Sequence, residues 1–182
     1  MQAVKLEGGE DMAPTIHRIS QAGIPVVAHI GLTPQRQNSL GGFRVQGKTA
    51  SAALKLMRDA LAVQEAGALM VVLEAMPAEI ASVVTRKLRI PTIGIGAGHA
   101  CSGQVLVQAD MTGNFPPGRF LPRFVKTYAD VWGEASRGIE RYRHEVKNGV
   151  FPSSDYTYAV SPDAVAEFKQ AVGDTSEGEN ER

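Results

Sequence analysis

The run Leu69-Met70-Val71-Val72-Leu73 is the clearest indication of the fold class of this chain. Gly67 precedes the run and Glu74 follows it, so an uninterrupted apolar segment stands between a helix-ending glycine and a carboxylate. A strand that is apolar on both faces is typical of a parallel sheet covered by helices. The run therefore predicts a central strand of an α/β domain, with helices expected on both faces of the sheet.

The same alternation of apolar runs and helical segments extends over roughly the first 110 residues. The predicted strands are residues 3–6, 25–30, 69–73, 90–95 and 104–107. No good helix fits between the last two of them. The order β-α-β-α-β-α-β-β predicts a parallel sheet of five strands. Residues 31–48 form a connection longer than the usual βα loop, which favours a binding or lid role.

Three predicted helices connect these strands. Asp11 is a candidate cap for the first helix, and Gly23 ends it. The second begins at Thr49 or Ser51, and Pro77 suits the first turn of the third. Apolar spacing predicts the inner faces to be Ile16 and Ile19 in the first helix, Leu54, Met57 and Leu61 in the second, and Ile80, Val83, Val84 and Leu88 in the third.

Beyond Gly113 the pattern changes. Residues 115–120 are rich in turn-forming and aromatic residues, and a mainly helical segment is predicted over residues 124–147. A short helix is predicted over residues 161–172. The polar, acidic residues 173–182 are expected to be disordered.

The composition narrows the class of function. Lys plus Arg and Asp plus Glu number 19 each in 182 residues, so no basic excess indicates nucleic-acid binding. No apolar run approaches the roughly 20 residues needed to cross a bilayer, and no signal peptide is visible. The single cysteine, Cys101, cannot form an internal disulfide, which favours an intracellular location. A packing role for Cys101 is favoured over a nucleophilic one.

Polar residues stand where the predicted strands end, the position of reactive groups in parallel α/β folds. Lys5 and Glu7 share one face at the end of the first strand. His29 lies near the end of the second strand, and Glu74 follows the third. The fourth ends in the glycine-rich stretch 94–98, a weak signal for phosphate or dinucleotide binding.

Each of these residues also has a structural interpretation. Lys5 and Glu7 could form an ion pair, and His29 could be a hydrogen-bonded core histidine. Glu74 is harder to dismiss, because a carboxylate after an apolar strand is costly to bury unless it is paired or protonated. Burial raises a carboxyl pKa towards neutrality, which suits a general base.

Together these side chains indicate a site for an anionic substrate and a metal ion. Lys5 can hold a carboxylate, Glu7 can ligate a hard cation, and Glu74 can take a proton. Such roles fit deprotonation next to a carbonyl group that a metal ion polarises.

The order and spacing of several motifs closely resemble the ketopantoate hydroxymethyltransferase family. The matching stretches are residues 4–9, 29–35, 41–47, 72–74, 90–98 and 122–126. The resemblance extends to about residue 158, and it implies a (β/α)8 TIM-barrel fold of which about five of the eight strands are present. We therefore divide the chain into a partial barrel with C-terminal helices, residues 1–158, and an extension, residues 159–182.

The family resemblance implies transfer of a hydroxymethyl group from 5,10-methylenetetrahydrofolate to 3-methyl-2-oxobutanoate, giving 2-dehydropantoate for pantothenate and coenzyme A. It implies Mg²⁺ as the metal. On the matching positions, Lys5 and His29 would bind the 2-oxoacid, Glu7 would lie in the magnesium shell, and Glu74 would be the base. It also implies a homo-oligomer in the cytoplasm or an organelle such as the mitochondrion, without nucleic acid or membrane as partner.

The chain departs from the family in one respect. The family's two magnesium-ligating aspartates, one of them followed by a serine that contacts the 2-oxoacid, lie on earlier strands, and nothing before Lys5 supplies them. We therefore expect the isolated chain to be poorly active. The alternatives are a non-catalytic fragment or degenerate subunit that associates with full-length homologues, a related barrel lyase or mutase, and a complete flavodoxin-like domain.

Overall fold

The computed structural model describes residues 2–36, 42 and 44–174. Two compact units make up the chain, Met1–Trp132 and Gly133–Arg182. The sequence-based boundary between residues 158 and 159 stays a prediction. The predicted disorder of the acidic tail concerns residues that, apart from 173 and 174, lie outside the described ones.

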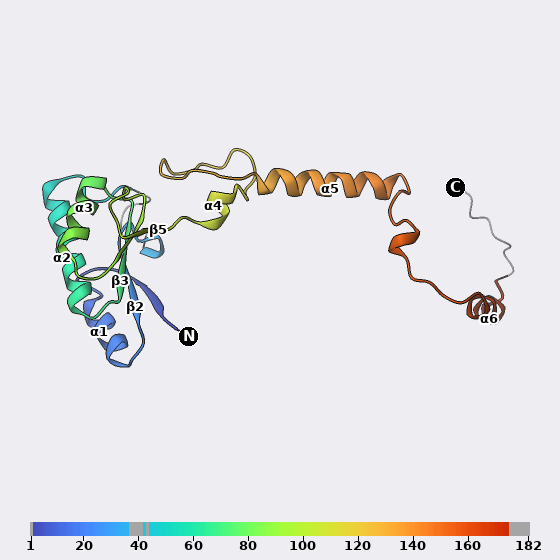
Figure 1. Ribbon diagram of the computed structural model, residues 1–182, viewed down its shortest axis with the longest axis horizontal. Helices are drawn as coiled ribbons and strands as arrows, with labels where there is room; N and C mark the ends of the chain where they lie inside the picture. Colours follow the sequence, from blue (N-terminus) through green and yellow to red (C-terminus); the bar gives the residue numbers. More distant parts are fainter. Residues whose placement is uncertain (1, 37–41, 43, 175–182) are drawn as a thin grey trace. The chain divides into compact units, whose positions relative to one another are not determined.

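The first unit is a parallel α/β structure (Figure 1). Its elements are β1 (Val4–Glu7), α1 (Ala13–Gln21), β2 (Val26–Gly31), α2 (Ala50–Glu65), β3 (Met70–Glu74), α3 (Ala78–Lys87), β4 (Thr92–Ile95), β5 (Gly103–Gln104) and α4 (Gln108–Thr112). The five strands follow one another in the order β1-β2-β3-β4-β5, and every pair is parallel. The predicted fold class is confirmed as a parallel sheet of the partial TIM-barrel type. Within the described residues β1 and β5 each pair with one strand, so the sheet is not closed.

The helices α1, α2 and α3 lie on one face of the sheet (Figure 1). Alternate residues of the strands face them: Val26, Ala28 and Ile30 of β2 are buried, as are Val71 and Leu73 of β3. Together with apolar side chains of the three helices they form the core. The expectation of helices on both faces was wrong, because the other face carries the polar side chains described below.

The inner face of α2 differs from the predicted one. Leu54 is 61% exposed, whereas Leu56 is 6% exposed and packs in the core with Ala60 and Val63. Both sets of residues have helical spacing, so periodicity alone could not choose between them. The small Ala60 lets the helix approach the sheet closely, which favours the observed face. In α3, Val83 is likewise exposed, while Ala81 and Val84 are buried.

The ends of the helices agree with the sequence in part. Thr49 caps α2, and its hydroxyl accepts a hydrogen bond from the Ala52 amide at 3.2 Å. Asp11 does not cap α1, because its carboxylate accepts from the Gly9 amide and pairs with Arg36 instead. No helix lies between β4 and β5 among residues 96–102, as predicted.

The segment after β5 differs most from the prediction. The strand expected over residues 104–107 is only Gly103–Gln104, and a short helix α4 follows it. The helix expected from residue 124 begins at Val131, as α5 (Val131–Lys147). The Tyr128 amide donates to the Met111 carbonyl at 2.7 Å, so this backbone bonds to α4 rather than to itself.

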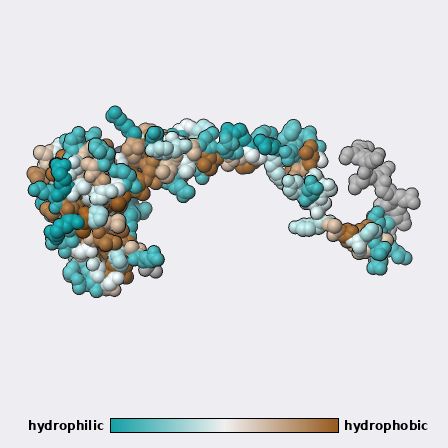
Figure 2. Space-filling view, viewed as in Figure 1, coloured by the Kyte–Doolittle hydropathy of each residue, from teal (hydrophilic) through white to brown (hydrophobic). Residues whose placement is uncertain are grey.

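The second unit contains most of α5, the 3-10 turn η2 (Ser154–Tyr156) and α6 (Pro162–Val172). Ser161 caps α6, which matches the predicted helix. Figure 2 shows apolar surface along α5 and α6. The exposed apolar side chains of these helices include Ile139, Val146 and Phe168. Within the described part of the chain no helix is long and apolar enough to cross a membrane.

The observed face of α2 gives a direct test. We expect Leu56→Ala to lower the free energy of unfolding by about 2–5 kcal/mol, because it leaves a cavity in the core. Leu54→Ala removes the same atoms from an exposed position, and we expect a change within about 0.5 kcal/mol. Urea unfolding followed by circular dichroism measures both. Equal losses would contradict the described packing of α2.

Candidate functional site

The carboxyl ends of β1, β2 and β3 bring the four predicted site residues together. Glu7 is the register partner of His29, and Gly31 is the partner of Glu74. Ala28 and Leu73 point to the helices, so their chain neighbours His29 and Glu74 point to the opposite face. The period of two along parallel strands thus places these side chains on one surface.

His29 lies at the centre of this group. The Lys5 ammonium donates to Glu7 Oε1 at 2.9 Å and lies 3.3 Å from His29 Nδ1. On the other side of the ring, His29 Nε2 lies 3.0 Å from Glu74 Oε2. The imidazole therefore stands between two carboxylates, with the ammonium group beside one of them. The ion pair of Lys5 and Glu7 exists, while the ligand-binding roles of these residues stay predictions.

The burial of the group is uneven. The side chains of Glu7 and Glu74 are 7% and 12% exposed, whereas that of Lys5 is 50% exposed. His29 Nε2 is buried and makes no hydrogen bond of ordinary geometry within the described residues, in spite of its short distance to Glu74. A buried polar atom without a hydrogen bond is costly in a finished site. A ligand group or a proton shared with Glu74 would satisfy it.

Glu7 is also held by a residue that the sequence did not single out. The Gln35 amide donates to Glu7 Oε2 at 3.0 Å, while Lys5 occupies Oε1. Both carboxylate oxygens are therefore engaged, and the orientation of the group is set. The sequence could have indicated Gln35, because it is the last residue of the matching stretch 29–35 at the end of the second predicted strand. Residues 37–41 and 43 of that connection, where a lid was predicted, lie outside the described residues.

The backbone around Glu74 is tightly constrained. A Cβ atom added to Gly31, at φ +91°, would lie 2.2 Å from the Glu74 carbonyl oxygen, so only glycine fits there. The Leu32 amide donates to that same oxygen at 2.9 Å. Ala75 follows with a φ of +50°, which is strained for a residue with a side chain. Its amide donates to the Ile95 carbonyl at 2.9 Å, which fixes the strand end that carries Glu74.

A second polar cluster supports the loop after β1. The Glu10 amide donates to Asp59 Oδ1 at 2.9 Å, and Lys55 donates to the same carboxylate at 2.7 Å. The hydrogen bond to Asp59 raises the pKa of Lys55 above its usual value, against the opposing effect of burial. Sequence reasoning missed Asp59, although its spacing of four from Lys55 on a helix was a usable signal.

Asp11 belongs to the same loop. Burial raises the pKa of its carboxyl group, but the Arg36 guanidinium and the Gly9 amide outweigh that effect and hold this pKa below its usual range. The carboxylate therefore stays ionised at neutral pH and keeps its contact with Arg36 at 2.6 Å. These contacts hold the loop that follows Glu7.

The described residues do not fit a magnesium site. Mg²⁺ demands octahedral oxygen coordination, and its sites generally use carboxylates that are free to bind it. Glu7 already contacts the Lys5 ammonium, and Glu74 lies on the far side of the His29 ring. Within the described part of the chain no three His, Cys, Asp or Glu side chains are grouped to hold a metal ion.

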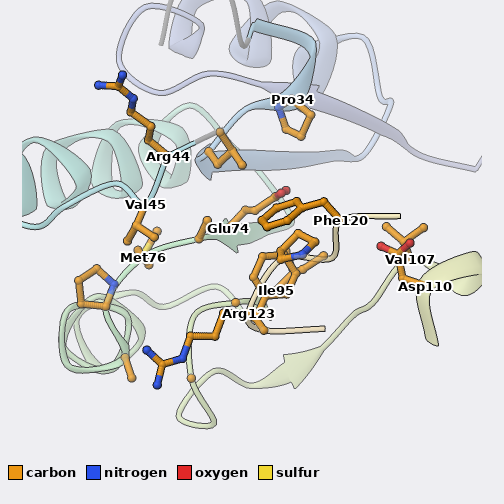
Figure 3. A pocket seen from close by; sticks show the side chains of 18 of the residues that line it. Pro34, Arg44, Val45, Glu74, Met76, Ile95, Val107, Asp110, Phe120 and Arg123 are labelled. Carbon is orange, nitrogen blue, oxygen red and sulfur yellow. The ribbon is translucent and has the colours of Figure 1, made fainter. Parts of the chain in front are cut away.

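A cleft of about 1170 Å³ opens beside Glu74 (Figure 3). Its lining is largely apolar and comes from the ends of β3 and β4, the start of α3 and the segment after β5. Gly96 and Gly98 of the predicted glycine-rich stretch border this cleft. Cys101 packs against Gly94 outside it, in keeping with a packing role.

Comparisons with known proteins agree with the motifs. A sequence model of the family described as ketopantoate hydroxymethyltransferase matches residues 1–154. A 3-methyl-2-oxobutanoate hydroxymethyltransferase of Emericella nidulans is 67% identical over 177 residues, which are 97% of this chain and 51% of that relative. Relatives of the same name from Nitratidesulfovibrio vulgaris and Chloroflexus aurantiacus are 51% and 53% identical over 172 residues, which are 94% of this chain and 55% and 59% of their own lengths. The chain spans about half the length of the curated relatives it matches.

The backbone at Ala75 provides a test of the constraint on Glu74. We expect Ala75→Gly to leave the free energy of unfolding unchanged or to raise it, because glycine adopts a positive φ without strain. Ala53→Gly, within α2, is the matched control and should lose about 0.5–1 kcal/mol. Denaturant unfolding of both variants measures the difference. A larger loss at position 75 than at position 53 would refute the strained conformation.

Proposed function

The chain belongs to the ketopantoate hydroxymethyltransferase family, and we propose that its site performs the proton abstraction of hydroxymethyl transfer to 3-methyl-2-oxobutanoate. The product is 2-dehydropantoate, on the route to pantothenate and coenzyme A, and the donor is 5,10-methylenetetrahydrofolate. The observation that carries the proposal is the position of Glu74, a nearly buried carboxylate beside His29 that also lines the large cleft.

In the proposed reaction Glu74 takes the proton from C3 of the 2-oxoacid. The electron pair of that C–H bond moves into the enolate, whose C3 then forms a bond to the one-carbon unit of the donor. The bonds between that carbon and the two folate nitrogens break, and one water molecule supplies the hydroxyl group. The two nitrogens take up the proton that Glu74 accepted and the remaining proton of the water. Tetrahydrofolate and 2-dehydropantoate leave, so the atoms balance without an oxidant or reductant.

Lys5 and His29 support this step by charge and position. The half-exposed Lys5 ammonium can hold the carboxylate of the 2-oxoacid, because an exposed cation beside a buried site attracts an anionic substrate. His29 contacts Glu74 through Nε2, so it can share the proton that Glu74 accepts. Glu7 keeps Lys5 in place through its ion pair. Magnesium stays in the proposal only as the ion that the family resemblance implies.

A second candidate function is a subunit that associates with homologous chains. Within the described residues β1 pairs only with β2, and its other edge offers unpaired backbone groups to a further strand. The intracellular location and the homo-oligomeric state stay proposals in either case.

Hydrogen–deuterium exchange at C3 tests the proton abstraction without the donor. The chain is incubated with 3-methyl-2-oxobutanoate and Mg²⁺ in deuterated water, and the C3 proton signal is followed by NMR. We expect exchange above the buffer rate, and a loss of at least about 100-fold in Glu74→Gln, because the base is removed.

Glu65→Gln is the control for this experiment, since Glu65 is an exposed carboxylate paired with Arg89 on the other side of the unit. It should keep the wild-type exchange rate. Equal rates in Glu74→Gln and the wild type would refute the proposed role of Glu74. Repeating the measurement with a chelator shows whether exchange depends on a metal ion.

A further inference from the structure

The end of β1 is the least supported of the three strand ends that form the site. Within the described residues β1 pairs with β2 alone, whereas β2 and β3 each pair on both sides. Glu7 ends the strand, and the loop after it begins with Gly8 and Gly9. Two successive glycines allow many backbone conformations, so the local sequence does not fix the path of this loop. The positions of Lys5 and Glu7 therefore depend on what holds the loop.

Hydrogen bonds rather than packing hold this loop. Gly8 and Gly9 border a cleft of about 500 Å³, which the start of α2 also lines. The Gly8 amide donates to the His29 carbonyl at 3.0 Å, and the Glu10 amide donates to Asp59 Oδ1 at 2.9 Å. The first bond joins two strand ends of the site to each other. The second ties the loop to α2, a helix that packs in the core.

The Asp59 carboxylate is well placed to hold the loop. Its side chain is 11% exposed, and the Lys55 ammonium contacts its two oxygens at 2.7 and 3.0 Å, which fixes its orientation. A Cβ atom added to Gly9 would collide with this carboxylate, so the loop backbone lies directly against it. Lys55 and Arg58 also lie 3.7 Å from Glu10 Oε2. Residues of α2 therefore hold both the backbone and the side chain of Glu10.

We propose that Asp59 is a positioning residue of the site. By accepting the Glu10 amide it fixes the end of β1, and it thereby keeps Lys5 and Glu7 beside His29. The inference rests on the proposed function, since it concerns the same site, and it adds a residue of α2 that contacts no reacting atom. The connection is short, because Glu10 follows Glu7 by three positions.

The proposal separates substrate binding from proton abstraction. Glu74 lies on β3, and the end of that strand is held by the Ala75 amide, which donates to the Ile95 carbonyl at 2.9 Å. Asp59 takes no part in that contact. Loss of the Asp59 carboxylate therefore displaces Lys5, the proposed contact of the oxoacid carboxylate, and leaves the base in place. The expected effect is on KM rather than on kcat.

Gln64 provides a matched control on the same helix. It is 6% exposed, and its Oε1 accepts a hydrogen bond from the Arg89 amide at 2.6 Å. Arg89 precedes β4, so this contact lies at the end of the sheet away from the site. Gln64→Ala thus removes a buried polar side chain that holds a loop amide, as Asp59→Ala does, without touching the loop after β1.

Amide hydrogen exchange at Gly8, followed by NMR, tests the hold on the loop. We expect exchange about tenfold faster in Asp59→Ala, because a charged hydrogen bond is lost and the loop opens more often. Asp59→Asn should give about a threefold increase, since its neutral oxygen still accepts the Glu10 amide. Gln64→Ala should equal the wild type. Urea unfolding of each variant shows how far global stability contributes, and Asp59→Asn decides the matter if Asp59→Ala does not fold.

The C3 exchange of 3-methyl-2-oxobutanoate, measured with Mg²⁺ at increasing oxoacid concentration, tests the effect on the site. In Asp59→Ala we expect KM to rise about tenfold while kcat stays within about threefold of the wild type, because binding at Lys5 is lost and the base is kept. Asp59→Asn should restore most of the affinity. Gln64→Ala should keep both constants.

The outcomes distinguish this inference from the proposed function. Unchanged Gly8 exchange in the Asp59 variants, or equal acceleration in Gln64→Ala, overturns the role of Asp59. An unchanged KM in Asp59→Ala, or a fall in kcat alone, overturns it as well. If the wild type shows no C3 exchange, faster Gly8 exchange confined to the Asp59 variants still supports the hold of Asp59 on the site, and the failure belongs to the proton abstraction.

Discussion

The alternation of side chains along parallel strands is the constraint on which both the core and the site depend. Ala28 and Leu73 face the helices and are fully buried, and their neighbours His29 and Glu74 face the other way. A shift of one residue in the register of either strand would bring a polar side chain, His29 or Glu74, into the core and an apolar one into the site. The register of the strands therefore determines both the packing of the core and the geometry of the site.

Buried charge on the polar face is tolerated because the charged groups contact one another. Glu7 accepts from the Lys5 ammonium and the Gln35 amide, and Glu74 lies beside His29. An isolated carboxylate would be costly to bury in this position, and contact with hydrogen-bond donors and a cation offsets part of that cost. The unsatisfied His29 Nε2 is the exception, and it lies where the proposed proton transfer takes place.

The sequence predicted the parallel sheet and the four strand-end residues, because both follow from local periodicity and from the known geometry of parallel strands. It could not choose the inner face of α2, since Leu54 and Leu56 belong to stripes of the same spacing. It also missed the cleft. Phe124 lines the cleft because its ring packs on Gly96, which is distant from it in the sequence. No local sequence pattern predicts such a contact.

Because Phe124 packs on Gly96, the NMR chemical shifts of Gly96 report on this wall of the cleft. An aromatic ring that lies directly on a glycine shifts the resonances of its two α protons through the ring current, and unequally, since the two protons sit at different heights beneath it. The chemical shifts of this one glycine therefore form a built-in spectroscopic reporter of whether the segment after β5 is seated on the sheet. Any ligand that tilts the ring would register there without an added label.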